Sequence, residues 1–192
     1  MARPIGYDRK TVLDQAMHVF WHNGFCATHM RDLTSATRLK PGSLYGAFPS
    51  KEALFLEALN HYGTRSVDLI RADLSTAPSP LAGIHALVTR IATETRSAVP
   101  GCLLVNTAVE LARHNVAVRR TINTYRTRIH SLLAETLTRA RTFGEIPQDK
   151  DPEALATFAL CIIWGLRTLG PIDPQDADIT AVTRTLLDTL TK

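Results

Sequence analysis

The chain has 192 residues, of which 45% are hydrophobic and 21% are charged, and its formal net charge is +4. This composition allows one or two domains with real cores, and the mild positive charge permits nucleic-acid binding without itself indicating it. No apolar run reaches the roughly 20 residues that a bilayer span needs, and residues 1–10 contain no apolar signal-peptide core, which excludes a membrane protein and a secreted one. The sequence therefore predicts a soluble cytoplasmic protein.

The three cysteines lie far apart, at Cys26, Cys102 and Cys161. No cysteine or histidine cluster has the spacing of a metal site, so we expect no metal and no cofactor. An odd number of unpaired cysteines is typical of a reducing compartment. We expect Cys26 and Cys161 to be small buried residues.

Residues 8–23 form the first predicted helix, which Gly24 ends. Its apolar residues recur at helical spacing. They are Leu13, Ala16, Met17 and Phe20.

Two short helices are predicted next, over residues 28–37 and 41–48. Pro41 suits the first turn of a helix, where a missing N–H costs nothing. Leu44 and Phe48 lie four residues apart, so they share one face that can anchor the second helix in a core. Two short helices joined by a tight turn indicate a helix-turn-helix motif, whose second helix enters the major groove of DNA.

A longer helix is predicted over about residues 51–74, after the N-cap Ser50. It would span about 35 Å and could link a DNA-binding head to the rest of the chain. The breaks and apolar stripes that follow predict five more helices, over residues 81–97, 102–113, 115–143, 153–169 and 177–191. No strand-like alternation occurs.

The predicted fold is therefore all-α with about nine helices. We expect a helix-turn-helix DNA-binding domain over residues 1–50, which continues into a linking helix over residues 51–74. Residues 51–192 would form a helical domain for effector binding and dimerisation.

Several motifs near the helix-turn-helix occur in a characteristic order. They are Phe20-Trp21-His22-Asn23-Gly24-Phe25, Thr28, Leu33, Gly42-Ser43-Leu44-Tyr45, Phe48 and Ser50-Lys51-Glu52-Ala53-Leu54-Phe55. Together they resemble the DNA-binding domain of the TetR family of transcriptional regulators, over roughly residues 8–60. Arg38 and Lys40 depart from the family pattern, which usually has Gly in the turn and Ser or Thr at the start of the recognition helix.

This resemblance implies a ligand-responsive regulator, commonly a repressor, that binds a palindromic operator as a homodimer. Its expected partners are double-stranded DNA, a second copy of the chain and a small, largely apolar effector that releases the DNA. The DNA-binding residues that it implies are Thr28, His29, Lys40, Pro41, Gly42, Ser43, Tyr45 and Lys51. Of these, Thr28, Ser43, Tyr45 and Lys51 are expected at phosphates, and Lys40, Pro41 and Ser43 near base edges.

The resemblance also implies that the last two helices pair across a two-fold axis. The expected interface residues are Leu155, Ala159, Ile162, Leu166, Ile179, Val182 and Leu186. The alternative is that these apolar stripes close the core of a single chain.

An effector cavity is expected among the helices of the second domain. The predicted lining residues are Tyr62, Ile91, Cys102, Asn106, Val109, Tyr125, Ile129 and Phe158. Cys102 belongs to a Gly101-Cys102-Leu103 segment that resembles one TetR subgroup. It also lies at a predicted helix N-terminus, which favours a thiolate, so a redox- or electrophile-sensing repressor is the alternative trigger.

Two other functional classes compete with a ligand-responsive regulator. A helical enzyme is disfavoured, because the chain lacks a GxSxG motif, a P-loop, a dinucleotide fingerprint and metal-spaced histidines, so we expect no catalytic residues. A ligand-free architectural DNA-binding protein would not need so large a second domain.

Overall fold

The computed structural model describes residues 7–96, 100–172 and 176–191. Within these ranges the secondary structure is entirely helical. The elements are α1 (Arg9–Ala27), α2 (Met30–Thr37), α3 (Pro41–Ala47), α4 (Lys51–Thr76), α5 (Pro80–Arg96), α6 (Leu103–Leu111), α7 (Val116–Thr142), α8 (Pro152–Leu169), the 3-10 turn η1 (Gly170–Ile172) and α9 (Asp176–Thr191). The all-α prediction is confirmed, and the nine predicted helices all form.

Local sequence signals place the helix starts. Ser50 accepts the backbone N–H of Ala53 at the start of α4, and Asn115 accepts that of Val118 at the start of α7, both at 3.0 Å. These side chains satisfy N–H groups that a helix leaves without partners in its first turn. Because such caps act between neighbouring residues, the helix starts lie within a few residues of their predicted positions.

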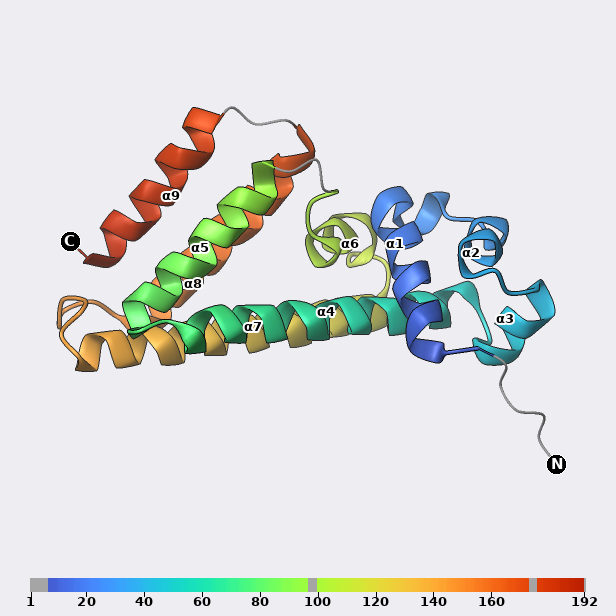
Figure 1. Ribbon diagram of the computed structural model, residues 1–192, viewed down its shortest axis with the longest axis horizontal. Helices are drawn as coiled ribbons and strands as arrows, with labels where there is room; N and C mark the ends of the chain where they lie inside the picture. The colour runs from blue at the N-terminus through green and yellow to red at the C-terminus, as the bar shows by residue number, and fades with distance from the viewer. Residues whose placement is uncertain (1–6, 97–99, 173–175, 192) are drawn as a thin grey trace.

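The molecule is elongated, with α1, α2 and α3 gathered at one end (Figure 1). Helices α4 and α7 run side by side along its length, and α4 also packs against α1 and α5. Helix α8 packs on α7 and α5, and α9 packs on α5 and α8. Short α6 lies between the two parts, where it contacts α1, α4, α7 and α8. Helix α4 therefore belongs to both parts of the molecule.

The expectation that no stretch is long and apolar enough to cross a membrane is wrong for α8. The 21-residue helical stretch Pro152–Ile172 has a mean hydropathy of 1.6 and is long and apolar enough to cross a membrane by length and composition. Its inner face packs on α5 and α7, and its outer face carries apolar side chains that a second protein surface can cover. The stretch also contains Glu153 and Arg167. Its apolar character therefore fits a helix whose inner face packs on α5 and α7.

Candidate DNA interface and effector pocket

The helix-turn-helix is held in place by an aliphatic and an aromatic anchor on α3. Leu44 and Phe48 are 0% and 2% exposed, and the Arg9 guanidinium lies 4.4 Å from the centre of the Phe48 ring. An isolated helix of seven residues is unstable in water, so these contacts are what keep α3 folded. The opposite face of α3 presents Gly42, Ser43 and Tyr45 to solvent.

The turn before α3 has a strained backbone. Arg38 has φ 54° and ψ 18°, which is the left-handed region that non-glycine residues rarely adopt. Lys40 then occupies the N-cap position of α3 without a side-chain capping bond, and Pro41 follows as the first helical residue. The turn thus places two cationic side chains, both exposed, next to the outer face of α3.

Side chains of α4 and α6 form hydrogen bonds to the junction between α1 and α2. Glu110 of α6 accepts the backbone N–H of Cys26 at 2.7 Å through Oε1 and that of Phe25 at 3.1 Å through Oε2. The Lys51 ammonium of α4 donates to the carbonyl oxygens of Phe25 and Thr28, both at 2.9 Å. Residues from α4 and α6 therefore fix the segment that leads into the helix-turn-helix.

Close approach at this junction depends on Gly24. Its φ is +76°, and a Cβ there would lie 3.1 Å from the Glu110 carboxylate. A hydrogen bond to Glu110, burial and the charge of Glu110 all raise the pKa of the Cys26 thiol, although the nearby Lys51 ammonium opposes this. The thiol is exposed, contrary to the sequence-based expectation, but it stays protonated at neutral pH.

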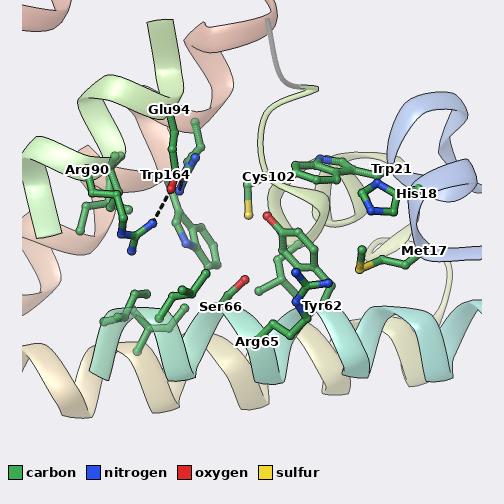
Figure 2. Close-up of a pocket in the computed structure, with 17 residues that line it drawn as sticks. Met17, His18, Trp21, Tyr62, Arg65, Ser66, Arg90, Glu94, Cys102 and Trp164 are labelled. Carbon is green, nitrogen blue, oxygen red and sulfur yellow. Dashed lines mark hydrogen bonds and ion pairs between the residues drawn. The ribbon is translucent and has the colours of Figure 1, made fainter. Parts of the chain in front are cut away.

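A cavity of about 240 Å³ lies between the two parts of the molecule (Figure 2). Helices α1, α4, α5, α6, α7 and α8 all contribute to its wall. The lining residues are Met17, His18, Trp21, Tyr62, Arg65, Ser66, Leu69, Ile70, Arg90, Ile91, Glu94, Cys102, Leu104, Ile129, Ile163, Trp164 and Arg167. Most are apolar, which is typical of small-molecule sites.

Three charged residues, Arg90, Glu94 and Arg167, lie together in the wall of this cavity, which also contains Arg65, bound to Asp14. Arg90 binds Asp73 at 2.7 Å and Glu94 at 2.8 Å, and Arg167 also binds Glu94. Burial works against the charge of Glu94, but the hydrogen bonds and positive charges of both arginines outweigh it, so the pKa of Glu94 lies below its usual value. Glu94 is therefore ionised and shared by two guanidinium groups.

Another part of the cavity wall contains Cys102, Tyr62 and Trp21 (Figure 2). Burial raises the pKa of the Tyr62 phenol well above its usual value, and the neighbouring Cys102 raises it further. The Tyr62 hydroxyl therefore stays protonated. The Trp21 indole N–H donates to the carbonyl of Gly101 at 3.2 Å, and its ring meets Tyr62 edge-on with the centres 5.4 Å apart.

Two family models match the chain. Residues 12–58 match the one described as bacterial regulatory proteins, tetR family, and residues 80–186 match the one described as tetracyclin repressor-like, C-terminal domain. The second match alone spans more than half of the chain. The chain belongs to the TetR family of transcriptional regulators. It is accordingly a homodimeric regulator that binds double-stranded DNA, as the sequence resemblance implied.

Individual TetR proteins are similar over nearly the whole chain. The HTH-type transcriptional repressor ComR of Escherichia coli K12 is 32% identical over 168 residues, which cover 85% of this chain and 80% of ComR. A cysteine mutant of the TetR regulator CifR, complexed with a 26-base-pair operator, has 34% identity and a TM-score of 0.86 over 98% of this chain and 100% of that one. FadR from Bacillus subtilis, in complex with stearoyl-CoA, shares the fold at 18% identity and a TM-score of 0.72, with 96% of this chain and 98% of that one covered.

Most of the DNA-binding residues implied by the resemblance are exposed around the helix-turn-helix, and their contacts with DNA stay a prediction. Those exposed on α3 or directly before it are Lys40, Pro41, Gly42, Ser43 and Tyr45, and His29 is exposed at the start of α2. Thr28 is the exception, because its side chain is 0% exposed and its hydroxyl donates to the Gly24 carbonyl at 2.6 Å. A phosphate contact from the Thr28 side chain is therefore wrong. His29 is the N-cap of α2, and its backbone N–H donates to Asp32 at 2.7 Å.

Lys51 has a structural role that the sequence did not reveal. With two of its N–H groups bound to carbonyl oxygens and its ammonium 4.2 Å from the centre of the Phe25 ring, only one N–H is left for a phosphate. We expect Lys51→Met to weaken operator binding through a misplaced α2, with a stability loss of roughly 3–6 kcal/mol, because each of its two hydrogen bonds contributes about 1.5–3 kcal/mol.

Salt dependence separates this role from a phosphate contact. Lys40→Met should reduce the slope of log affinity against log salt by about 0.9 for each phosphate that the protein no longer neutralises, whereas Lys51→Met should leave the slope unchanged. Fluorescence anisotropy at several salt concentrations measures both. A reduced slope for Lys51→Met would assign Lys51 to the phosphate backbone instead.

Arg38→Asn should stabilise the fold while it weakens DNA binding. Asn adopts the left-handed conformation more readily than Arg, so we expect a gain of about 0.5–1 kcal/mol and a melting temperature higher by about 1–4 °C. Loss of the positive charge should lower operator affinity. Arg31→Asn is the matched control, since Arg31 is an exposed cation inside α2. An equal fall in melting temperature for both variants would contradict the strain at position 38.

The cavity contains half of the ligand-binding residues that the sequence predicted. Tyr62, Ile91, Cys102 and Ile129 line it. The prediction is wrong for the other four.

Each of the four has another environment. Asn106 donates its side-chain N–H to the Pro100 carbonyl at 2.7 Å, and Val109 is 80% exposed on the outer side of α6. Tyr125 is buried between α4 and α7, where its hydroxyl donates to the Asn60 carbonyl at 2.9 Å. Phe158 is 37% exposed on α8, away from the cavity.

The polar part of the cavity is not among the residues that the sequence predicted. Arg90 and Glu94 carry a weak signal, because opposite charges four residues apart on a predicted helix can pair. Arg167 and Trp164 carry none, since the apolar stripe of α8 indicates dimerisation rather than ligand binding. Trp21 by itself indicates only packing, and its contact with Gly101 joins residues that are 80 positions apart.

The dimer interface needs a similar correction. Leu155, Ala159, Leu166, Ile179 and Leu186 are all 8% exposed or less within one chain, so they belong to its core and cannot form a contact surface. Ile162 and Val182 are half-buried, and their place in the interface stays a prediction. Cys161, which we expected to be buried, is exposed on the outer face of α8.

Proposed function

We propose that this TetR regulator is a repressor whose DNA binding is controlled by a small molecule in the cavity between α1, α4, α5, α6, α7 and α8. The observation that carries this proposal is the position of the cavity. Its walls include Met17 and Trp21 of α1 and Tyr62 of α4, and both of these helices pack within the DNA-binding head. A ligand that fits one arrangement of these helices better than another shifts the protein toward it.

The same geometry supplies a route from the cavity to DNA. Cys102 at the start of α6 lines the cavity, and Glu110 near the end of α6 holds the α1–α2 junction. A displacement of α6 by the ligand would move the Glu110 carboxylate and with it the start of the helix-turn-helix. A coupling of about 1–3 kcal/mol between ligand and operator would change DNA affinity roughly 5- to 150-fold.

The proposed division of the chain is a head over residues 1–50 and a body over residues 51–192, joined by α4. The body supplies the dimer contact, for which we propose the outer face of α8. That face carries Ala154, Phe158, Cys161, Gly165 and Leu169, all exposed at helical spacing, with half-buried Ile162 beside them. Two such faces related by a two-fold axis would place two α3 helices about one DNA turn apart on a palindromic site.

We further propose that the protein works in the cytoplasm and regulates without catalysing a reaction. Membership of a family of soluble DNA-binding regulators supports both statements. The regulatory test has two stages. Genomic fragments bound by the protein are selected and sequenced to define the operator, and small molecules are then screened for release of that operator in gel-shift assays. A palindromic operator and a releasing compound are the expected results. A protein that binds DNA but responds to no compound would instead be architectural.

A thiol trigger is the second candidate function, and one observation favours it. Cys102 lines the cavity beside the Tyr62 hydroxyl while it is only 8% exposed, so a small reagent that enters the cavity reaches it. Cys102→Ser should abolish release by oxidants or electrophiles if the thiol is the sensor. The same variant should respond to a reversible ligand as the wild type does.

A further inference from the structure

We propose that the effector is a small organic carboxylate with an apolar, ring-shaped or branched body, and that its carboxylate binds Arg167. This inference rests on the proposed function, because it names the ligand class of the same cavity. It starts from the row of charges Asp73, Arg90, Glu94 and Arg167, which alternate in sign across α4, α5 and α8 (Figure 2 draws its cavity-lining members).

Arg167 is the incompletely bound end of this row. Arg90 has two carboxylates, at Asp73 and Glu94, whereas the only polar side-chain partner of Arg167 in the described part of the chain is the shared Glu94. The Arg167 side chain is only 16% exposed, so water reaches it poorly. A guanidinium has five N–H donors, so the donors of Arg167 that Glu94 does not bind are available at the cavity wall. The remaining donors of Arg167 therefore favour a ligand that brings acceptor oxygens.

Other polar groups of the cavity wall are also donors. The Trp164 indole N–H and the Ser66 hydroxyl have no hydrogen-bond partner among the described residues, and the raised pKa of Tyr62 keeps its hydroxyl protonated. The one carboxylate in the wall, Glu94, is already bound by two arginines. A planar carboxylate satisfies two guanidinium N–H groups at once, and a ligand amine would instead be repelled by the arginines.

The apolar part of the cavity wall determines which ligand body fits. Leu69, Ile70, Ile91, Ile129 and Ile163 supply aliphatic surface, and the rings of Trp21, Tyr62 and Trp164 supply flat faces. A cavity of about 240 Å³ has room for a small molecule and not for a long acyl chain plus a cofactor head group. The carboxylate would lie at the Arg167 end and the apolar body toward Tyr62.

Matched compounds test the charge requirement. Phenylacetate, phenylacetamide and phenethylamine share a ring-shaped body, and 4-methylpentanoate, 4-methylpentanamide and 4-methylpentylamine share a branched one. Each is titrated into the full-length dimer by thermal shift and calorimetry. We expect at least one carboxylate to raise the melting temperature and to bind roughly tenfold tighter than its amide, with the amine weakest. Equal or tighter binding of the amides or amines, or no binding by either carboxylate, would overturn the proposal.

Two substitutions test the residue assignment. Arg167→Met should remove the preference for the carboxylate, while Arg71→Met, which removes an exposed guanidinium paired with Asp68 on α4, should keep it. Glu94→Gln should bind the carboxylate several-fold more tightly than the wild type, because it removes the competitor for Arg167. A merely structural role of the ion pair predicts weaker binding for Glu94→Gln, so that result, or an unchanged preference in Arg167→Met, would contradict the inference. Circular dichroism confirms that each variant is folded.

Operator release distinguishes the ligand class from the proposed regulation. If neutral compounds release the selected operator and carboxylates do not, the ligand class is wrong and the proposed regulation stands. If carboxylates bind through Arg167 without changing operator affinity, the ligand class stands and the proposed regulation is wrong.

Discussion

Gly165→Arg is expected to yield a folded monomer with operator affinity lower by roughly a hundredfold or more, because two linked recognition helices bind far more tightly than one. Within one chain this position is exposed, and a Cβ at Gly165 would meet nothing within 4 Å. Arginine also favours helix over glycine by roughly 0.8 kcal/mol. The single chain therefore tolerates the substitution, whereas a two-fold contact through α8 would bury the charge and the bulk of two arginines.

Sedimentation velocity and gel-shift assays measure this effect. Ala72→Arg is the control, since it adds the same side chain at an exposed position of α4 and outside α8 and α9. The control should remain a dimer with normal affinity. A Gly165→Arg protein that stays dimeric at micromolar concentration would move the interface away from this face. Leu186→Asp is a poor probe by comparison, because Leu186 is 1% exposed and a charge there would disrupt the core.

Glu110→Ala is expected to loosen the entrance to the helix-turn-helix. It removes the carboxylate that accepts the N–H groups of Phe25 and Cys26. Hydrogen bonds to a charged group contribute about 1.5–3 kcal/mol each, so the two amide protons should exchange with solvent about ten- to a hundredfold faster. Operator affinity should fall as well, because a mobile α1–α2 junction must be ordered again when DNA binds.

Hydrogen exchange followed by NMR measures the first effect residue by residue. Glu110→Gln should lie between the wild type and Glu110→Ala, since a neutral amide oxygen is a weaker acceptor than a carboxylate. Glu135→Ala is the control on the exposed side of α7. Unchanged hydrogen-exchange protection of the Phe25 and Cys26 amides in Glu110→Ala would show that the Glu110 carboxylate does not stabilise the junction.

The helix-turn-helix was predictable from the sequence because its determinants are close together along the chain. The spacing of Leu44 and Phe48 makes them face one way, and Pro41 marks the helix start. The unusual Arg38 is also visible in the sequence as a departure from the usual glycine, and its positive φ explains why glycine is usual there. The burial of Thr28 was not predictable because a hydroxyl before a helix can cap, face DNA or bond back to a carbonyl, and the sequence does not choose among these.

The cavity was only half predictable because six helices form it. A helical stripe shows which side chains share a face, but an apolar helix such as α6 has more than one apolar face, and packing decides which one turns inward. Val109 therefore lies in solvent while Cys102 and Leu104 line the cavity. The sequence also placed Tyr125 in the cavity. Its ring instead packs against α4 at Gly63, where a Cβ would lie only 2.5 Å from the ring.

The amino-acid sequence by itself determined the helices and the helix-turn-helix, since these follow from caps, breaks and apolar spacings among neighbouring residues, and its motifs over residues 8–60 resemble the TetR family, which the family models confirm. The tertiary structure alone decided the cavity, the chain of ion pairs from Asp73 to Arg167, and the hydrogen bonds of Glu110 and Lys51 to the α1–α2 junction. These features join residues up to 85 positions apart. Such contacts depend on which faces of the helices pack together, and this choice is made by the summed burial of the whole core.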